Sequence, residues 1–111
     1  MSCLHEDISL PTLDSARTVP LDACPTQKCL TIYVSPRCPY CRAATGQIKD
    51  LRDYLVVRQV ATRVVVGHDK FAALQEYAAE FGQNTLLDSA SRVKIRGVPY
   101  FFVSKSVVSA K

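Results

Sequence analysis

Two cysteines separated by two residues are the clearest chemical feature of this 111-residue sequence. They lie in Cys38-Pro39-Tyr40-Cys41, after a run of apolar residues and before an amphipathic one. At the beginning of a helix, unpaired backbone N–H groups and the positive end of the helix dipole favour a thiolate on the first sulfur. We therefore expect Cys38 to be an exposed nucleophile and Cys41 to resolve a mixed disulfide formed at Cys38, which is thiol–disulfide exchange.

The residues beside these cysteines suit contact with a substrate. Pro39 fits the first turn of a helix, because its ring fixes φ and this position needs no N–H donor. Tyr40 would supply a flat amphipathic surface beside the sulfur. Arg37 and Arg42 would add positive charge if their side chains point toward the site. We expect Arg37, Pro39 and Tyr40 to contact the substrate.

The elements that must position the dithiol alternate between strand and helix. Residues 30–34 are aliphatic, β-branched or aromatic and are followed by Ser35-Pro36, which predicts a buried strand. Residues 60–66 are again rich in β-branched side chains and predict a second strand that ends at Gly67. Between them, apolar residues recur at helical spacing and predict an amphipathic helix that begins at the cysteines: Ala44, Ile48, Leu51 and Leu55.

The second half of the sequence continues this alternation. Asp69 as a cap and Gly82 as a terminator bound a predicted helix with one apolar stripe. Residues 83–92 have the composition of turns. A strand is expected at residues 100–103, and residues 104–111 alternate enough to form a partner strand. This order indicates an α/β fold of two or three layers.

The chain is expected to form one domain preceded by a leader. Its 111 residues are too few for two independent cores. Residues 1–28 contain three prolines and no sustained period, so we expect an extended or irregular leader with a short strand near residues 8–10. Residues 29–111 would form the domain.

Several motifs together resemble one family. Cys38-Pro39-Tyr40-Cys41, Tyr33 on the preceding strand, and Val98-Pro99 before a later strand resemble glutaredoxins, within the thioredoxin-fold superfamily. The resemblance covers residues 29–104. It implies a thioredoxin-like α/β fold, with a central mixed sheet flanked by helices. It also implies an enzyme that exchanges protein or small-molecule thiols and disulfides.

The resemblance extends to the substrate site. It implies that Pro99 is a cis-proline packed against the dithiol, and that the Val98 backbone pairs with a bound thiol substrate. No metal and no organic cofactor belongs to this mechanism, and glutathione is a candidate co-substrate. Ser35 stands where glutaredoxins carry a basic residue that meets a glutathione carboxylate, so glutathione dependence stays open.

Two segments differ in length from compact glutaredoxins. The segment between Cys41 and Pro99 is longer, as in bacterial disulfide oxidoreductases of the cell envelope. Only twelve residues follow Pro99, so we expect the C-terminal helix of the family to be missing. Either the sequence is truncated or the leader covers that face.

Other functions for the cysteines stay open. The same fold could bind a metal or an iron–sulfur cluster at Cys38 across a dimer, or could be a non-catalytic interaction domain. A structural zinc site would need Cys24 and Cys29 as a second ligand pair, and a predicted strand between them and Cys38 makes that geometry poor. Cys24 and Cys29 could instead form a disulfide, act as a regulatory pair, or share no role. Arg96 could join Arg37 in receiving a substrate carboxylate.

Composition and the N-terminal residues limit the expected binding partners and the expected cellular location of the protein. An apolar fraction of 48% indicates a folded chain, and a net charge of +4 from scattered basic residues gives no reason to expect nucleic acid. The longest apolar runs are far shorter than the roughly 18 residues that cross a membrane. The N-terminus has acidic residues and no apolar core of a signal peptide. We expect a cytoplasmic monomer, with the cell envelope or periplasm as the alternative for a processed form.

Overall fold

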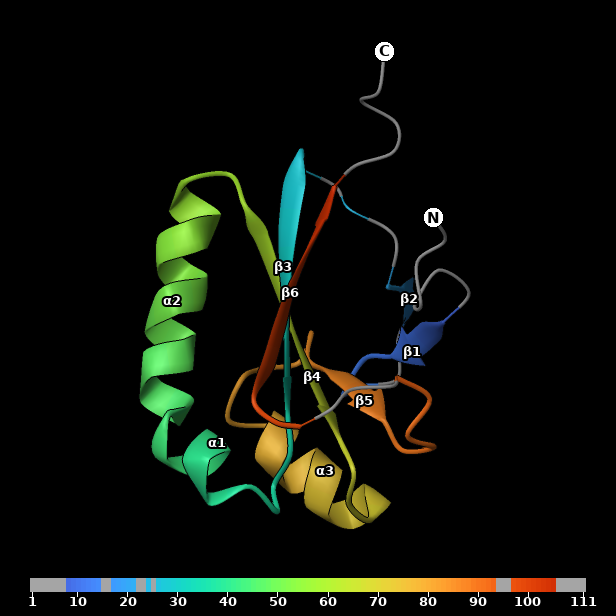
Figure 1. Cartoon of the computed structure of the whole chain (residues 1–111). Coiled ribbons are helices and arrows are strands. Elements are labelled where there is room, and N and C mark those ends of the chain that lie inside the picture. The colour runs from blue at the N-terminus through green and yellow to red at the C-terminus, as the bar shows by residue number, and fades with distance from the viewer. Residues whose placement is uncertain (1–7, 15–16, 22–23, 25, 94–96, 106–111) are drawn as a thin grey trace.

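Three of the predicted strands lie side by side in one sheet (Figure 1). In this computed structural model, which describes residues 8–14, 17–21, 24, 26–93 and 97–105, the strand order is β5-β4-β3-β6. The central strands β3 (Lys28–Val34) and β4 (Ala61–Gly67) are parallel, and β6 (Tyr100–Lys105) runs antiparallel to β3. Residues 32–34 and 64–66 are buried because both faces of the sheet are covered. The expected α/β fold with a central mixed sheet is confirmed.

A further strand lies where we expected turns. Residues 83–92 contain β5 (Leu86–Asp88), which pairs in parallel with residues 65–67 of β4. The prediction of turns was wrong because a strand of three residues, all of them buried, is too short to show an alternating pattern. Of the expected partner strand at residues 104–111, the first two residues complete β6 and the others lie outside the described residues.

The helix predicted at the cysteines is divided in two. α1 (Pro39–Ala43) and α2 (Thr45–Val57) meet at Ala44, whose ψ of 3° departs from helical values. The Thr45 hydroxyl donates to the Cys41 carbonyl at 3.1 Å, a contact that bends helices.

The next helix is shorter than predicted. α3 (Phe71–Ala78) has Lys70 as its N-cap, and the Asp69 carboxylate, predicted as the cap, accepts the Lys70 N–H at 2.7 Å. Gly82, with a φ of +113°, lies a few residues after the helix, where the chain turns toward β5.

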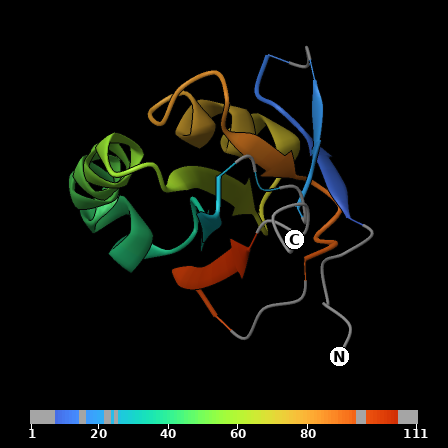
Figure 2. The same ribbon diagram turned by 90° about the horizontal axis from the view of Figure 1, so that it is seen from above.

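Helices and an N-terminal hairpin cover opposite faces of the sheet (Figure 2). On the helical face, Ile48 of α2 and Leu74 of α3 share one apolar core with Val64 and Val66 of β4. The other face packs against the hairpin of β1 (Ser9–Pro11) and β2 (Thr18–Pro20), which are antiparallel. Part of the predicted leader thus contributes apolar side chains to the second core: Ile8, Leu10 and Leu21.

A disulfide lies at the beginning of β3. It joins Cys24 to Cys29, and Cys29 is fully buried. Cys38 follows the other end of this seven-residue strand, so the disulfide and the dithiol are roughly 20 Å apart. Of the roles left open for Cys24 and Cys29, the structure supports a disulfide, and the pair does not serve as further ligands beside Cys38.

Candidate active site

Cys38 lies on the turn between β3 and α1. The strand ends at Val34, and the Cys38 N–H donates to the Ser35 carbonyl at 3.1 Å. Cys38 is the N-cap of α1, and its sulfur accepts the Cys41 N–H at 3.2 Å. The Cys38 side chain is partly exposed, so a substrate sulfur can approach it from solvent.

Cys41 has a different environment from Cys38. It is a free thiol like Cys38, but it is fully buried in the core on the helical face. Burial, followed by the adjacent Cys38 sulfur, raises the pKa of the Cys41 thiol to about 12. Cys41 is therefore protonated at neutral pH, and its sulfur is shielded from solvent whereas the Cys38 sulfur is partly exposed.

The loop before β6 completes the site from a distant part of the sequence. The Val98–Pro99 peptide bond is cis, as the resemblance to glutaredoxins implied. The Cys38 thiol donates to the Val98 carbonyl across 3.6 Å, although the two residues are 60 positions apart. Val98 also packs against both apolar cores, which fixes this loop beside the dithiol.

The side chains around Cys38 differ in whether a molecule from solvent can reach them. Tyr40 is 79% exposed, and exposed Arg37 lines an open cavity of about 480 Å³ together with His68 and Lys70. Arg42 instead donates to the Pro36 carbonyl at 2.7 Å and lies 5.2 Å from the centre of the Tyr77 ring. Arg37 can thus meet a substrate, whereas Arg42 supports the turn. Arg96 lies outside the described residues.

A buried polar pair supports the strands behind the dithiol, and sequence reasoning missed it. The Tyr33 hydroxyl donates to the fully buried Asp88 carboxylate at 2.7 Å. Burial, and next the hydrogen bond to Asp88, raise the pKa of Tyr33 far above its ordinary value, so the hydroxyl remains a donor. Asp88 also accepts the N–H groups of Arg92 and Val93 at 2.7 and 3.0 Å. The signal in the sequence was an acid directly after two leucines, which favours a strand end with a carboxylate held by backbone donors.

No metal-binding cluster occurs within the described residues. There, no group of three or more histidine, cysteine or acidic side chains is arranged to hold an ion. In that part of the chain, no third side chain lies beside Cys38 and Cys41 to form a metal site with them.

Comparison with known proteins identifies the fold. No protein-family model matches the chain, and no curated protein matches it. Among solved structures, a thioredoxin domain of a thiol-disulfide oxidoreductase from Bacteroides vulgatus is 17% identical, with a TM-score of 0.69 over 86% of this chain and 74% of its own. Thioredoxin from Wuchereria bancrofti is 22% identical, with a TM-score of 0.63 over 95% of this chain and 80% of its own.

A third structure comes from a secreted protein. It is a Mycobacterium tuberculosis disulfide oxidoreductase described as homologous to E. coli DsbE, and it is 14% identical, with a TM-score of 0.57. The match covers 78% of this chain and 62% of that protein. These similarities show that the chain has the thioredoxin fold. None of the helices in the described part of the chain is long and apolar enough to cross a membrane.

Proposed function

We propose that this protein is a thiol–disulfide oxidoreductase that acts through Cys38 and Cys41. The observation that carries the proposal is a partly exposed Cys38 sulfur, contacted by the Cys41 N–H, next to a buried Cys41 thiol one turn away. Structures with the same fold are described as thiol-disulfide oxidoreductases, which supports the same chemistry here.

Exchange begins when the Cys38 thiolate attacks one sulfur of a substrate disulfide. A new S–S bond joins Cys38 to the substrate, the old S–S bond breaks, and the second substrate sulfur leaves as a thiolate and takes up a proton. Cys41 then loses its proton and attacks the Cys38 sulfur. The Cys38–Cys41 disulfide forms, and the first substrate sulfur leaves as a thiol. The substrate gains two electrons and two protons that the dithiol loses, and the reverse sequence oxidises a substrate dithiol.

The neighbouring residues orient the substrate in this proposal. The Val98 carbonyl lies beside the Cys38 sulfur, and Pro99 follows it on the same loop, so an extended substrate would pair with this backbone. Tyr40 offers an exposed aromatic surface, and Arg37 offers a guanidinium to an acidic group of the substrate. The protein would act as a monomer without a resident cofactor.

Insulin reduction tests the activity. With dithiothreitol as reductant, micromolar protein should accelerate the precipitation of insulin B chains well beyond the rate with dithiothreitol alone. The matched control is the same protein with Cys38 carboxymethylated under native conditions, which leaves the buried Cys41 intact. Equal rates for treated and untreated protein would refute the proposed activity.

Glutathione is the proposed small-molecule co-substrate. Incubation of a Cys41→Ser variant with oxidised glutathione should give an adduct on Cys38 that peptide mass spectrometry locates. If a dithiol reductant supports insulin reduction and glutathione forms no adduct, the exchange proposal stands and the role of glutathione is refuted.

The Cys24–Cys29 disulfide bears on the compartment. Disulfides persist in oxidising compartments and are rare in the cytosol. One protein of similar structure is described as secreted. We therefore propose a cell-envelope or periplasmic location in preference to the cytoplasm.

Removal of this disulfide should lower stability without changing the dithiol. A Cys24→Ala/Cys29→Ala variant is expected to lose about 2 kcal/mol of unfolding free energy, because the disulfide closes a short loop in the unfolded chain. Urea denaturation measures the loss, and the alkylation rate of Cys38 serves as the control. An unchanged denaturation midpoint, or a slower Cys38 reaction, would contradict a purely stabilising role.

A further inference from the structure

A cavity of about 510 Å³ lies away from the dithiol. Its walls come from the second half of α2, the first half of β4, the hairpin and the loop of residues 81–85. Because β3 and β4 are parallel, the first residues of β4 lie beside the Cys24–Cys29 disulfide and not beside Cys38. No residue assigned to thiol exchange lines the cavity. A ligand in this cavity would therefore lie apart from the site of exchange.

The cavity faces the edge of β4. Residues 61–64 all line it, although successive side chains of a strand point to opposite faces. Within the described part of the chain, β5 pairs with residues 65–67, so residues 61–64 have β3 on one side and the cavity on the other. About half of their backbone N–H and C=O groups therefore point toward the cavity. An unpaired strand edge of this kind can accept another extended segment.

The lining of the cavity includes positively charged side chains. Three arginines line the cavity: Arg17, Arg52 and Arg63. Among the described residues, no acidic side chain lines it. Arg63 donates to the Leu21 carbonyl at 2.8 Å and so joins the hairpin to β4. Arg17 donates to the Asn84 side-chain oxygen at 3.0 Å. The cavity thus combines an open strand edge with cationic side chains that come from α2, from β4 and from the residue before β2.

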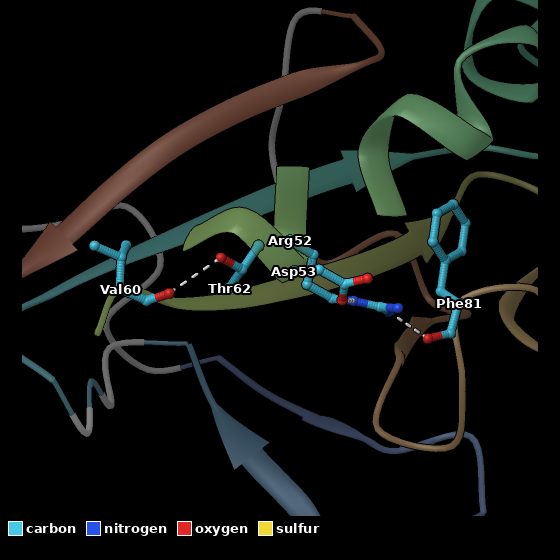
Figure 3. A network of polar contacts seen from close by, with 5 residues as sticks. All are labelled: Arg52, Asp53, Val60, Thr62 and Phe81. Carbon is cyan, nitrogen blue, oxygen red and sulfur yellow. Dashed lines mark hydrogen bonds and ion pairs between the residues drawn. The ribbon is translucent and has the colours of Figure 1, made fainter. Parts of the chain in front are cut away.

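Arg52 is placed to meet a ligand beside this edge. It extends from α2 to donate to the Phe81 carbonyl, and Thr62 of β4 lies in the same close-up (Figure 3). Its Nε is 3.6 Å from the Asp53 carboxylate, which is 76% exposed, so the pair is open to solvent and contributes little stability. Because a guanidinium has five N–H donors, these contacts leave Arg52 able to bind a further carboxylate.

We propose that this cavity, which forms an open groove along the edge of β4, binds an extended acidic segment of a partner protein. The segment would add a strand to β4 in line with β5. Backbone hydrogen bonds to residues 61–64 would hold the segment, and Arg17 and Arg52 would select acidic side chains. Apolar lining residues, among them Val19, Val56 and Phe81, would receive alternate apolar side chains. A small anion would use the arginines and leave the strand edge unpaired, so the peptide accounts for both features.

Nuclear magnetic resonance of the whole isotope-labelled protein tests the proposal. The probe is the peptide acetyl-Val-Glu-Val-Glu-Val-amide. It should cause saturable shifts of the backbone amides of residues 61–64 and slow hydrogen exchange at those that face the groove. The same peptide with lysine in place of glutamate should bind at least about tenfold more weakly, because it meets the arginines with like charge. A version N-methylated at alternate residues should also lose affinity, since it lacks backbone donors.

Single substitutions distinguish binding in the groove from a general attraction of the peptide by the positive charge of the protein. Arg17→Gln and Arg52→Gln should each weaken binding of the glutamate peptide by roughly two- to fivefold, as expected for partly exposed charge pairs. Arg58→Gln is the matched control, because Arg58 follows α2 and its guanidinium lies over Tyr54 outside the groove. Insulin reduction should be unchanged in all three variants.

Several results would overturn the proposal. Absence of saturable shifts at residues 61–64, equal affinity for the lysine peptide, or an equal effect of Arg58→Gln would each refute it. Equally strong binding of glutarate at the same amides would show a simple anion site. These outcomes leave the exchange reaction at Cys38 untouched, so the two proposals fail independently.

Discussion

Replacement of Cys38 by serine is expected to abolish thiol–disulfide exchange, whereas replacement of Cys41 by serine should stop the reaction halfway. A serine hydroxyl is not ionised at neutral pH, so Cys38→Ser should lower the insulin-reduction rate by roughly a thousandfold or more, to the rate of the reductant alone. In Cys41→Ser, Cys38 remains partly exposed and can still attack, but nothing displaces the captured substrate. Non-reducing electrophoresis and mass spectrometry should therefore detect a mixed disulfide on Cys38.

The control for this experiment removes the other cysteines. The same two variants in a Cys3→Ser/Cys24→Ala/Cys29→Ala background should behave identically, because the Cys24–Cys29 disulfide lies at the opposite end of β3. Accumulation of the mixed disulfide on Cys41 instead of Cys38 would reverse the assigned roles. Full activity of Cys38→Ser would reject the proposed mechanism.

Gly67→Ala is expected to destabilise the fold by about 2 to 4 kcal/mol, through a clash and the loss of a buried hydrogen bond. A Cβ at Gly67 would lie 1.9 Å from the Tyr33 hydroxyl oxygen and 2.7 Å from the ring carbon that carries it. Tyr33 must then move away from Asp88, which leaves a buried carboxylate with fewer donors. Urea denaturation followed by circular dichroism measures the change.

A second substitution shows whether this mechanism is correct. Tyr33→Phe removes the hydroxyl and should cost about 1 to 2 kcal/mol, since Asp88 keeps its two backbone donors. In that background Gly67→Ala should cost less than in the wild type, by about 1 kcal/mol or more, because the closest clash has gone. Strict additivity of the two changes would show that Gly67 acts through something other than the Tyr33–Asp88 pair.

The position of the dithiol could be predicted because its signal is local. The strand at residues 30–34, the turn at Ser35-Pro36 and the helix start at Cys38 follow one another along the chain, and local preferences place them. The same holds for the strand at residues 60–66, whose β-branched side chains fit a sheet buried on both faces. A short strand such as β5 has no such pattern, and its burial comes from its neighbours.

The sequence by itself thus determined the α/β alternation, the helix start at Cys38 and the spacing that places two cysteines one turn apart. Only the tertiary structure decided that the Val98 carbonyl lies beside Cys38, that Tyr33 donates to Asp88 55 residues away, and that the first half of β4 has an open edge lined by arginines. The reason is physical: periodicity and capping act over a few neighbouring residues, whereas strand order and the contacts between loops depend on how separate elements pack together.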